Sequence, residues 1–152
     1  MATFSIVAVD TTTGEVGSAG GSCIAGSIII SDVHPGIGAI HTQSYYLPSN
    51  QFYASSLMDE GYSPAEIIEL LENNDAQNNP GIRQYGIVDL LSGNNYGLLY
   101  EHECEEIEDA VWQGIPNSGE LAECTDPTIA RSASFTGNNC SSWKGHINGI
   151  NY

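Results

Sequence analysis

The start of the chain carries the pattern of a β-hairpin. Residues 3–10 are mostly β-branched or small and nearly all uncharged, which is typical of a strand buried on both faces. Residues 10–14 form a predicted turn, in which Gly14 can supply a positive φ angle. The return strand, residues 15–22, is rich in Gly, Ala and Ser, so we expect another group to pack very closely against it.

Further along the chain, apolar runs predict more strands and one helical region. The helical region is residues 50–73, where apolar residues recur at helical spacing. The helix restarts at Ser63, because this residue is a favourable N-cap, Pro64 suits the first helical position and Glu66 completes a capping box. The predicted strands are residues 28–30, 37–43, 84–90, 96–100 and 133–137.

The charge of the chain restricts its partners. The 152 residues include 19 acidic and only 3 basic side chains, which gives a net charge of −16. A field of this sign repels phosphate groups, so we expect no binding to nucleic acid or to an anionic membrane. No apolar run is long enough to span a membrane. The length is that of a single domain with a substantial core.

The four cysteines are spaced in a way that argues against a zinc site, because no two of them form a CxxC pair. Cys104 and Cys124 flank one acidic segment and are predicted to form a disulfide worth about 3 kcal/mol, which places the protein outside the reducing cytosol. Cys23 and Cys140 are open to pairing with each other or with cysteines elsewhere. The acidic run 101–109 favours a solvated helix start over a calcium site. We expect no metal and no cofactor.

Four stretches together resemble the domain-of-unknown-function family 1028, which is grouped with the N-terminal-nucleophile (Ntn) hydrolases. These stretches are residues 3–10, 38–43, 83–89 and 135–137. The resemblance covers residues 3–91 and 132–152, with residues 92–131 as an inserted segment. Gly145-His146 and Asn151-Tyr152 resemble the family's lead-in to a Gln-Gly-Asn segment. On this basis the chain is expected to be an N-terminal portion of a single Ntn-like domain.

The resemblance implies an α+β fold, a four-layer αββα sandwich in which two antiparallel sheets face each other and helices lie outside. We expect the 50–73 helical region on an outer face and the first hairpin in the centre of one sheet. The missing strands of the second sheet would come from the C-terminal half of the same domain as a second chain, or the protein forms a homo-oligomer.

The resemblance also implies hydrolysis of an amide bond, with Thr3 as the nucleophile and its own α-amine as the base. This chemistry requires removal of Met1 and Ala2, which would otherwise acylate the amine. The backbone around Gly21 and Ser22 is expected to stabilise the oxyanion, because no bulky side chain blocks the approach. Ser5, Ser22, Thr42 and Gln43 are expected to line the same end of the sheets.

Two classes of function follow from these expectations. The first is an Ntn-type amidohydrolase that acts on a peptide or a small amide. The second is a non-catalytic Ntn-fold protein that serves as a binding or assembly subunit of an extracellular structure. In both cases we expect a secreted or periplasmic protein. The lysine that proteasome-like members keep near the nucleophile has no expected counterpart, because Lys144 lies far along the chain.

Overall fold

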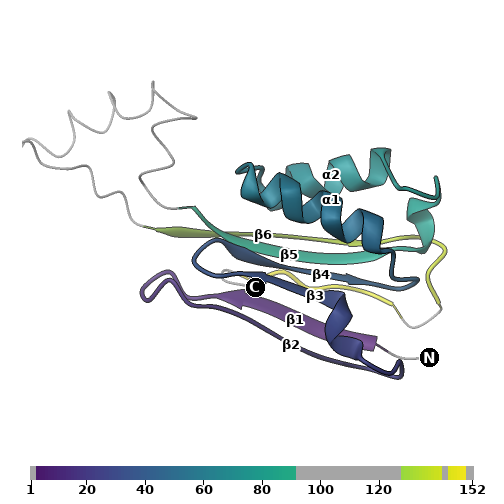
Figure 1. Ribbon diagram of the computed structural model, residues 1–152, viewed down its shortest axis with the longest axis horizontal. Coiled ribbons are helices and arrows are strands. Elements are labelled where there is room, and N and C mark those ends of the chain that lie inside the picture. The colour runs from purple at the N-terminus through teal and green to yellow at the C-terminus, as the bar shows by residue number, and fades with distance from the viewer. Residues whose placement is uncertain (1–2, 92–127, 142–143, 150–152) are drawn as a thin grey trace, which may run out of the picture. The chain divides into compact units, whose positions relative to one another are not determined.

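The computed structural model describes residues 3–91, 128–141 and 144–149 (Figure 1). The chain divides into two compact units, residues 1–90 with 130–152 and residues 91–129. Nearly all described residues belong to the first unit, and the following description concerns that unit alone. Three predictions lie outside the described residues: the Cys104–Cys124 disulfide, the strand at 96–100 and the acidic run at 101–109. The predicted insertion, residues 92–131, also lies outside them apart from its last four residues.

The first hairpin forms as predicted. β1 (Thr3–Val9) pairs antiparallel with β2 (Val16–Ser22), in a register that runs from Thr3 opposite Ser22 to Val9 opposite Val16. The turn between them is held by the Asp10 carboxylate, which accepts a hydrogen bond of 2.8 Å from the backbone N–H of Thr12. Gly14 adopts a φ of 74°, so the predicted turn and its positive φ angle are both confirmed.

The other four strands form a second sheet, in the order β3-β4-β5-β6 (Figure 1). Its strands are β3 (Ser31–His34), β4 (Gly38–Gln43), β5 (Gln84–Leu91) and β6 (Ile129–Thr136). β4 is antiparallel to both β3 and β5. The predictions for β4 and β5 are confirmed, and β6 starts four residues before the predicted 133–137 strand.

The predicted strand at residues 28–30 is wrong. The segment Ser27–Ile30 is instead a turn of 3₁₀ helix, η1, which leads directly into β3. Gly26 has a φ of 70°, and the backbone N–H of Ile29 donates to its carbonyl at 3.2 Å. Only Ile30 of the three isoleucines is buried. A short apolar run does not by itself distinguish a strand from a helical turn. Here Gly26, with its positive φ angle, precedes a helical turn.

The predicted helical region forms two helices, α1 (Pro48–Asp59) and α2 (Pro64–Asn73). They are separated by Gly61, which has a φ of 89°. The capping box at the start of α2 is confirmed, because the Glu66 N–H donates to Ser63 Oγ at 3.3 Å and the Ser63 N–H donates to Glu66 Oε2 at 2.8 Å. A second short 3₁₀ helix, η2 (Pro80–Ile82), precedes β5.

Both helices cover one face of the four-stranded sheet (Figure 1). Their apolar side chains pack against those of β4 and β5 to form the larger of two cores. Its buried members are Ile40, Ala54, Leu57, Met58, Ile67, Ile68, Leu71, Tyr85 and Ile87.

The hairpin lies on the opposite face of the four-stranded sheet (Figure 1). A smaller core between the two sheets contains Val7, Val9, Ala39, Val88 and Leu90. The expectation that the hairpin lies in the centre of a sheet is wrong for the described residues, because β1 and β2 form a sheet of two strands.

The expectation that both faces of the first strand are buried is also wrong. Successive side chains of a strand point to opposite faces. Val7 and Val9 therefore face the four-stranded sheet, whereas Phe4 is 73% exposed and Ile6 is 49% exposed. At the level of an α+β fold with two antiparallel sheets and two helices, the predicted fold class is confirmed. No helix in the described ranges is long and apolar enough to cross a membrane.

Candidate active site

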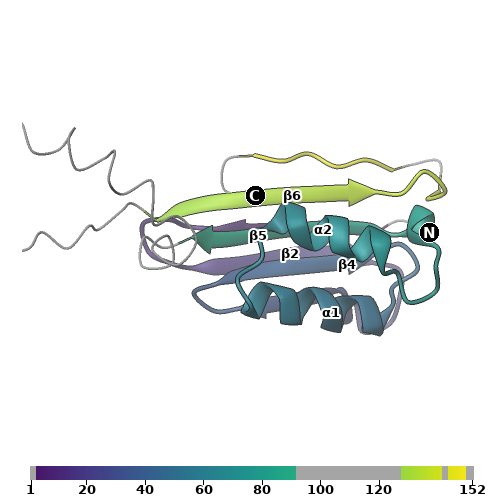
Figure 2. The ribbon, with the colours of Figure 1, turned by 90° about the horizontal axis from the view of Figure 1, so that it is seen from above.

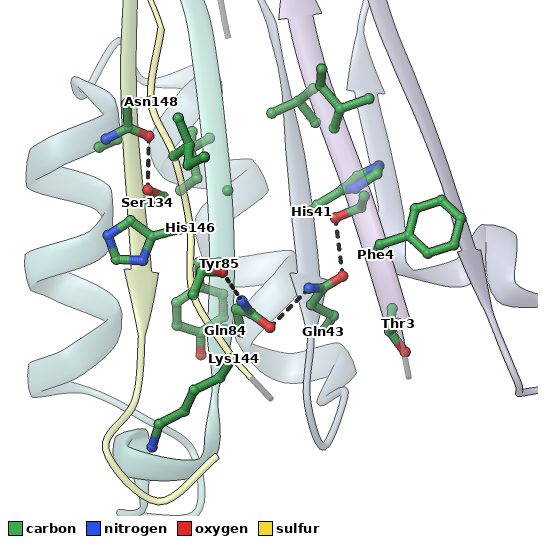
Figure 3. Close-up of a pocket in the computed structure, with 18 residues that line it drawn as sticks. Thr3, Phe4, His41, Gln43, Gln84, Tyr85, Ser134, Lys144, His146 and Asn148 are labelled. Carbon is green, nitrogen blue, oxygen red and sulfur yellow. Dashed lines mark hydrogen bonds between the residues drawn. The ribbon is translucent and has the colours of Figure 1, made fainter. Parts of the chain in front are cut away.

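A cavity of about 610 Å³ lies between the hairpin and the four-stranded sheet (Figure 3). One wall is the first five residues of β1, residues 3–7, and another is the extended segment 144–148. This segment runs beside β6 (Figure 2). Ser134 Oγ of β6 donates to Asn148 Oδ1 of the segment at 2.7 Å (Figure 3). β4, β5 and β6 contribute the remaining lining residues. The cavity thus brings the first strand together with the last described segment of the chain.

Thr3 borders this cavity at the start of β1. Its Oγ1 atom is 2.8 Å from Ser22 Oγ, the hydroxyl of the residue directly opposite in the hairpin. Two of the residues that the sequence proposed for the site are therefore in direct contact. Ser22 does not itself border the cavity, so its contribution is to hold the Thr3 hydroxyl.

Ser5 and Gln43 also border the cavity, and they are bonded to each other across the two sheets. Ser5 Oγ donates to Gln43 Oε1 at 3.0 Å, and Gln43 Nε2 donates to Gln84 Oε1 at 2.9 Å (Figure 3). Gln84 Nε2 then donates to Thr136 Oγ1 at 3.2 Å and to the carbonyl oxygen of Gly145 at 2.8 Å. These side chains form one continuous chain of hydrogen bonds across the cavity from β1 to the 144–148 segment.

Two other proposed site residues lie outside the cavity. Gly21 does not border the cavity and lies against the ring of Phe4: a Cβ atom added at Gly21 would lie 3.0 Å from Phe4 Cζ. The close packing predicted for the return strand is thus made by an aromatic ring of the same hairpin. Thr42 is 2% exposed, and the alternation along β4 places it on the opposite face from Gln43, the face that carries Ile40 and the helices.

His41 is a lining residue that the sequence argument did not select. It is 2% exposed, and neither of its ring nitrogens has a hydrogen-bond partner among the described residues. Burial lowers the pKa of His41 to about 4, so the ring is neutral at pH 7. The strand at 37–43 was predicted, and its alternation already placed His41 on the same face as Gln43. That periodicity was the signal available in the sequence.

Lys144 lies on the wall of the same cavity as Thr3, despite the long separation along the chain. Its Nζ atom donates to the carbonyl oxygens of Gly137 and Cys140, at 3.4 and 3.3 Å, and to that of Asn138. The ammonium group therefore stabilises the loop after β6 and is not directed at Thr3 (Figure 3). The large separation along the sequence therefore did not predict where this lysine lies, because the fold brings it to the wall of the cavity.

A second polar cluster joins β3 to α1. Ser55 Oγ is 3.0 Å from His34 Nε2, and His34 Nδ1 is 2.7 Å from Asp59 Oδ1. The order of groups is that of a serine hydrolase triad. However, Ser55 lies in the middle of α1, where helical hydrogen bonds occupy the backbone N–H groups that an oxyanion would need. We interpret this cluster as a structural link.

The remaining cysteines and possible metal ligands do not add to the site. Cys23 is exposed and Cys140 is buried, and they are not bonded to each other. Cys140 Sγ lies 3.3 Å from the carbonyl oxygen of Arg83. Within residues 3–91, 128–141 and 144–149 no group of three His, Cys, Asp or Glu side chains is arranged to hold a metal ion.

Fold and site define an α+β protein whose two antiparallel sheets enclose a cavity lined by hydroxyl, amide and imidazole groups. The chain belongs to the family of unknown function DUF1028, which it matches over residues 3–109. The match begins at Thr3 and extends into the segment predicted as an insertion, and it does not include residues 132–152. No curated protein and no solved structure matches the chain.

Proposed function

We propose that this protein is an N-terminal-nucleophile amidohydrolase that acts on a peptide or a small amide. Thr3 is the nucleophile once Met1 and Ala2 have been removed. The observation that carries the proposal is the position of Thr3: it starts the first strand, it borders a cavity of about 610 Å³, and its hydroxyl is held by Ser22.

The chemistry uses groups at one end of the hairpin. Thr3 Oγ1 attacks the amide carbonyl, and its proton passes to the α-amine of the same residue, which titrates near pH 8 and is partly unprotonated at neutral pH. The amine of the product leaves with that proton, and water then hydrolyses the ester formed on Thr3. Ser22 lies opposite Thr3 in the ladder. Because neither Gly21 nor Ser22 borders the cavity, the proposal assigns Ser22 the hold on the Thr3 hydroxyl and gives this stretch no oxyanion role.

The proposal includes the finer fold class. An Ntn-type αββα sandwich has a helix layer, two facing sheets and a second helix layer. The described residues supply the first three of these layers in that order, α1 and α2, the four-stranded sheet and the hairpin. Removal of Met1 and Ala2 fits an exported protein, which we propose as secreted or periplasmic, with the Cys104–Cys124 bond formed.

The test is to determine the mature N-terminus and then compare Thr3→Ala with Thr3→Ser. The Ala variant should lose release of p-nitroaniline from peptide p-nitroanilides, whereas the Ser variant should keep part of it, since only the Ser variant retains a hydroxyl. Thr13→Ala removes an exposed hydroxyl in the turn and serves as the control. A mature terminus at another residue, or full turnover by Thr3→Ala, contradicts the proposal.

A second candidate function is a non-catalytic binding or assembly subunit. The observation that favours it is the outer face of the hairpin, where Phe4 is 73% exposed and Ile6 is 49% exposed. The C-terminal half of the domain as a second chain, or a second copy, would cover this face. Size-exclusion chromatography with light scattering should then show a species larger than 16.2 kDa. A monomer that unfolds cooperatively contradicts this function.

A further inference from the structure

The last acceptor in the hydrogen-bonded chain across the cavity determines which atom of each side chain donates and which accepts. The carbonyl oxygen of Gly145 can only accept, so the Gln84 atom 2.8 Å away from it must be the amide nitrogen. The Gln84 oxygen therefore points toward Gln43 and can only accept as well. Gln43 must donate to it through its own nitrogen, at 2.9 Å. This orientation follows from chemistry alone, whichever way either amide is drawn.

The same assignment of donors and acceptors determines whether Ser5 can donate or accept a further hydrogen bond. With its nitrogen engaged by Gln84, Gln43 presents its oxygen to Ser5, and that oxygen accepts the Ser5 hydroxyl hydrogen over 3.0 Å. Ser5 has no second hydrogen to donate, and only the lone pairs of its Oγ atom are left. Ser5 therefore presents a hydrogen-bond acceptor to the cavity that it borders.

His41 lines the same cavity and provides a second, independent argument for a ligand. Both ring nitrogens are shielded from solvent, and neither has a partner among the described residues. A buried polar group without a hydrogen bond is unfavourable by about 1–3 kcal/mol. At neutral pH the ring is uncharged and carries one donor and one acceptor. A molecule that enters the cavity and displaces the groups that cover these nitrogens would supply the missing bond.

The charges around the cavity restrict the class of ligand. Among the residues that the structure describes, no carboxylate side chain lines it. The titratable side chains that do are His41, Tyr85, Lys144 and His146. The Lys144 ammonium is bonded to backbone carbonyls, Asn50 donates to the Tyr85 hydroxyl on the helix side, and His146 Nδ1 is 2.9 Å from Thr136 Oγ1. A cation therefore finds no carboxylate among the described lining residues, and an anion without an N–H cannot bond to the lone pairs that Ser5 presents.

We propose that this cavity binds an uncharged molecule through an amide group, with Ser5 Oγ accepting the amide N–H and His41 bonding to the same molecule. The proposal deepens the hydrolase function proposed above, since it names the group that the site recognises. It is nevertheless a statement about binding, and it holds whether or not Thr3 cleaves the bound amide.

The experiment compares three probes of one shape: benzamide, benzoate and benzylammonium. Each is titrated into the full chain while the imidazole signals of ¹³C-labelled histidine are followed by NMR, with the His41 signal assigned by its loss in His41→Phe. Benzamide should shift the His41 signal saturably, and the two ions should shift it at least tenfold more weakly. A benzoate or benzylammonium affinity equal to that of benzamide overturns the proposal, as does the absence of any saturable shift.

Variants then assign the bonds. Ser5→Ala should weaken benzamide binding about tenfold, the effect of one hydrogen bond, while Ser5→Thr retains the oxygen and most of the affinity. Ser18→Ala is the matched control, because Ser18 lies in the same hairpin, bonds to Ser31 Oγ at 2.5 Å and does not border the cavity. An unchanged affinity in Ser5→Ala overturns the assignment.

His41→Phe should also weaken benzamide binding about tenfold, and it should do so without loss of thermal stability, because it removes an unpartnered polar group. An unchanged affinity there overturns the role of His41. Thr3→Ala separates the two proposals. If it binds benzamide like the wild type and the wild type hydrolyses no amide, the binding site stands and the hydrolase function fails.

Discussion

Two buried polar side chains, one on each face of the four-stranded sheet, differ in how their hydrogen bonds are satisfied. On the helix face, Asp75 is 4% exposed and fully partnered: it accepts from Arg83 Nε at 2.8 Å, from Asn50 Nδ2 at 2.7 Å and from the backbone N–H of Gln77 at 2.9 Å. Although burial alone raises the pKa of Asp75, the hydrogen bonds from Arg83, the Asn79 N–H and Asn50 hold it well below its usual range. On the hairpin face, His41 is equally buried and has no partner among the described residues.

This difference in hydrogen-bond partners is the one expected between a structural site and a binding site. A buried charge whose hydrogen bonds are all made inside the molecule stabilises one arrangement of the chain. A buried imidazole whose bonds are unmade is unfavourable for folding and suits a group that arrives from outside. The Asp75 cluster on the helix face therefore contributes to stability, and His41 on the face toward the hairpin belongs to the candidate functional site. The following predictions test this division.

The largest effect is expected from Arg83→Met. The side chain of Arg83 is 2% exposed, and its removal leaves the Asp75 carboxylate buried without a counter-charge. Breaking such a pair lowers the free energy of unfolding by about 3–5 kcal/mol. Urea unfolding of the two proteins measures the difference.

The control is the double variant Arg83→Met with Asp75→Asn, which removes both charges. It should be more stable than Arg83→Met alone, because no uncompensated charge remains. A loss below about 1 kcal/mol in the single variant would mean that the helix face is not stabilised by this pair.

An intermediate effect is expected from pH, through His41. Its pKa is about 4 in the folded protein and 6.5 in an unfolded chain, so the unfolded state binds more protons between these values. This contribution to stability is complete above pH 6.5 and is lost as the pH falls toward 4. Relative to His41→Phe, the wild type should lose about 3 kcal/mol of unfolding free energy between pH 7 and pH 4.

The comparison with His41→Phe cancels the carboxylates, which also titrate in this range. Equal pH dependence in the wild type and in His41→Phe would show that the ring is partnered in solution.

The smallest changes in the free energy of unfolding are expected from substitutions on the two faces of the hairpin. Val9→Thr and Ile6→Thr both keep the branched Cβ that favours a strand, so the difference between them reports burial. Val9 is 6% exposed, and a hydroxyl there should lower the free energy of unfolding by about 2 kcal/mol. Ile6 is 49% exposed, and its change should stay within about 0.5 kcal/mol. Thermal unfolding measures both, and a large loss in Ile6→Thr would indicate that a partner covers this face.

Much of the fold was predictable because its signals are local. The turn from Asp10 to Gly14, the capping box from Ser63 to Glu66 and the apolar strands β4 and β5 each depend on a few neighbouring residues. The run at residues 28–30 was predicted wrongly because it has no periodicity to read, and Gly26 turned the chain just before it. The outer face of β1 was misjudged because its residues are as apolar as those of the inner face, and composition does not say which face is covered.

The sequence by itself determined the hairpin, the two helices and the position of Thr3 at the start of the first strand. The tertiary structure alone decided which polar residues meet. It brought Ser5 to Gln43 and Gln84, placed Lys144 on the cavity wall and sent Thr42 to the helix face. Within the described part of the chain, it also left the nitrogens of His41 without a partner. The reason is that alternation assigns each side chain to a face, whereas the packing of two sheets decides which faces meet and where a cavity remains.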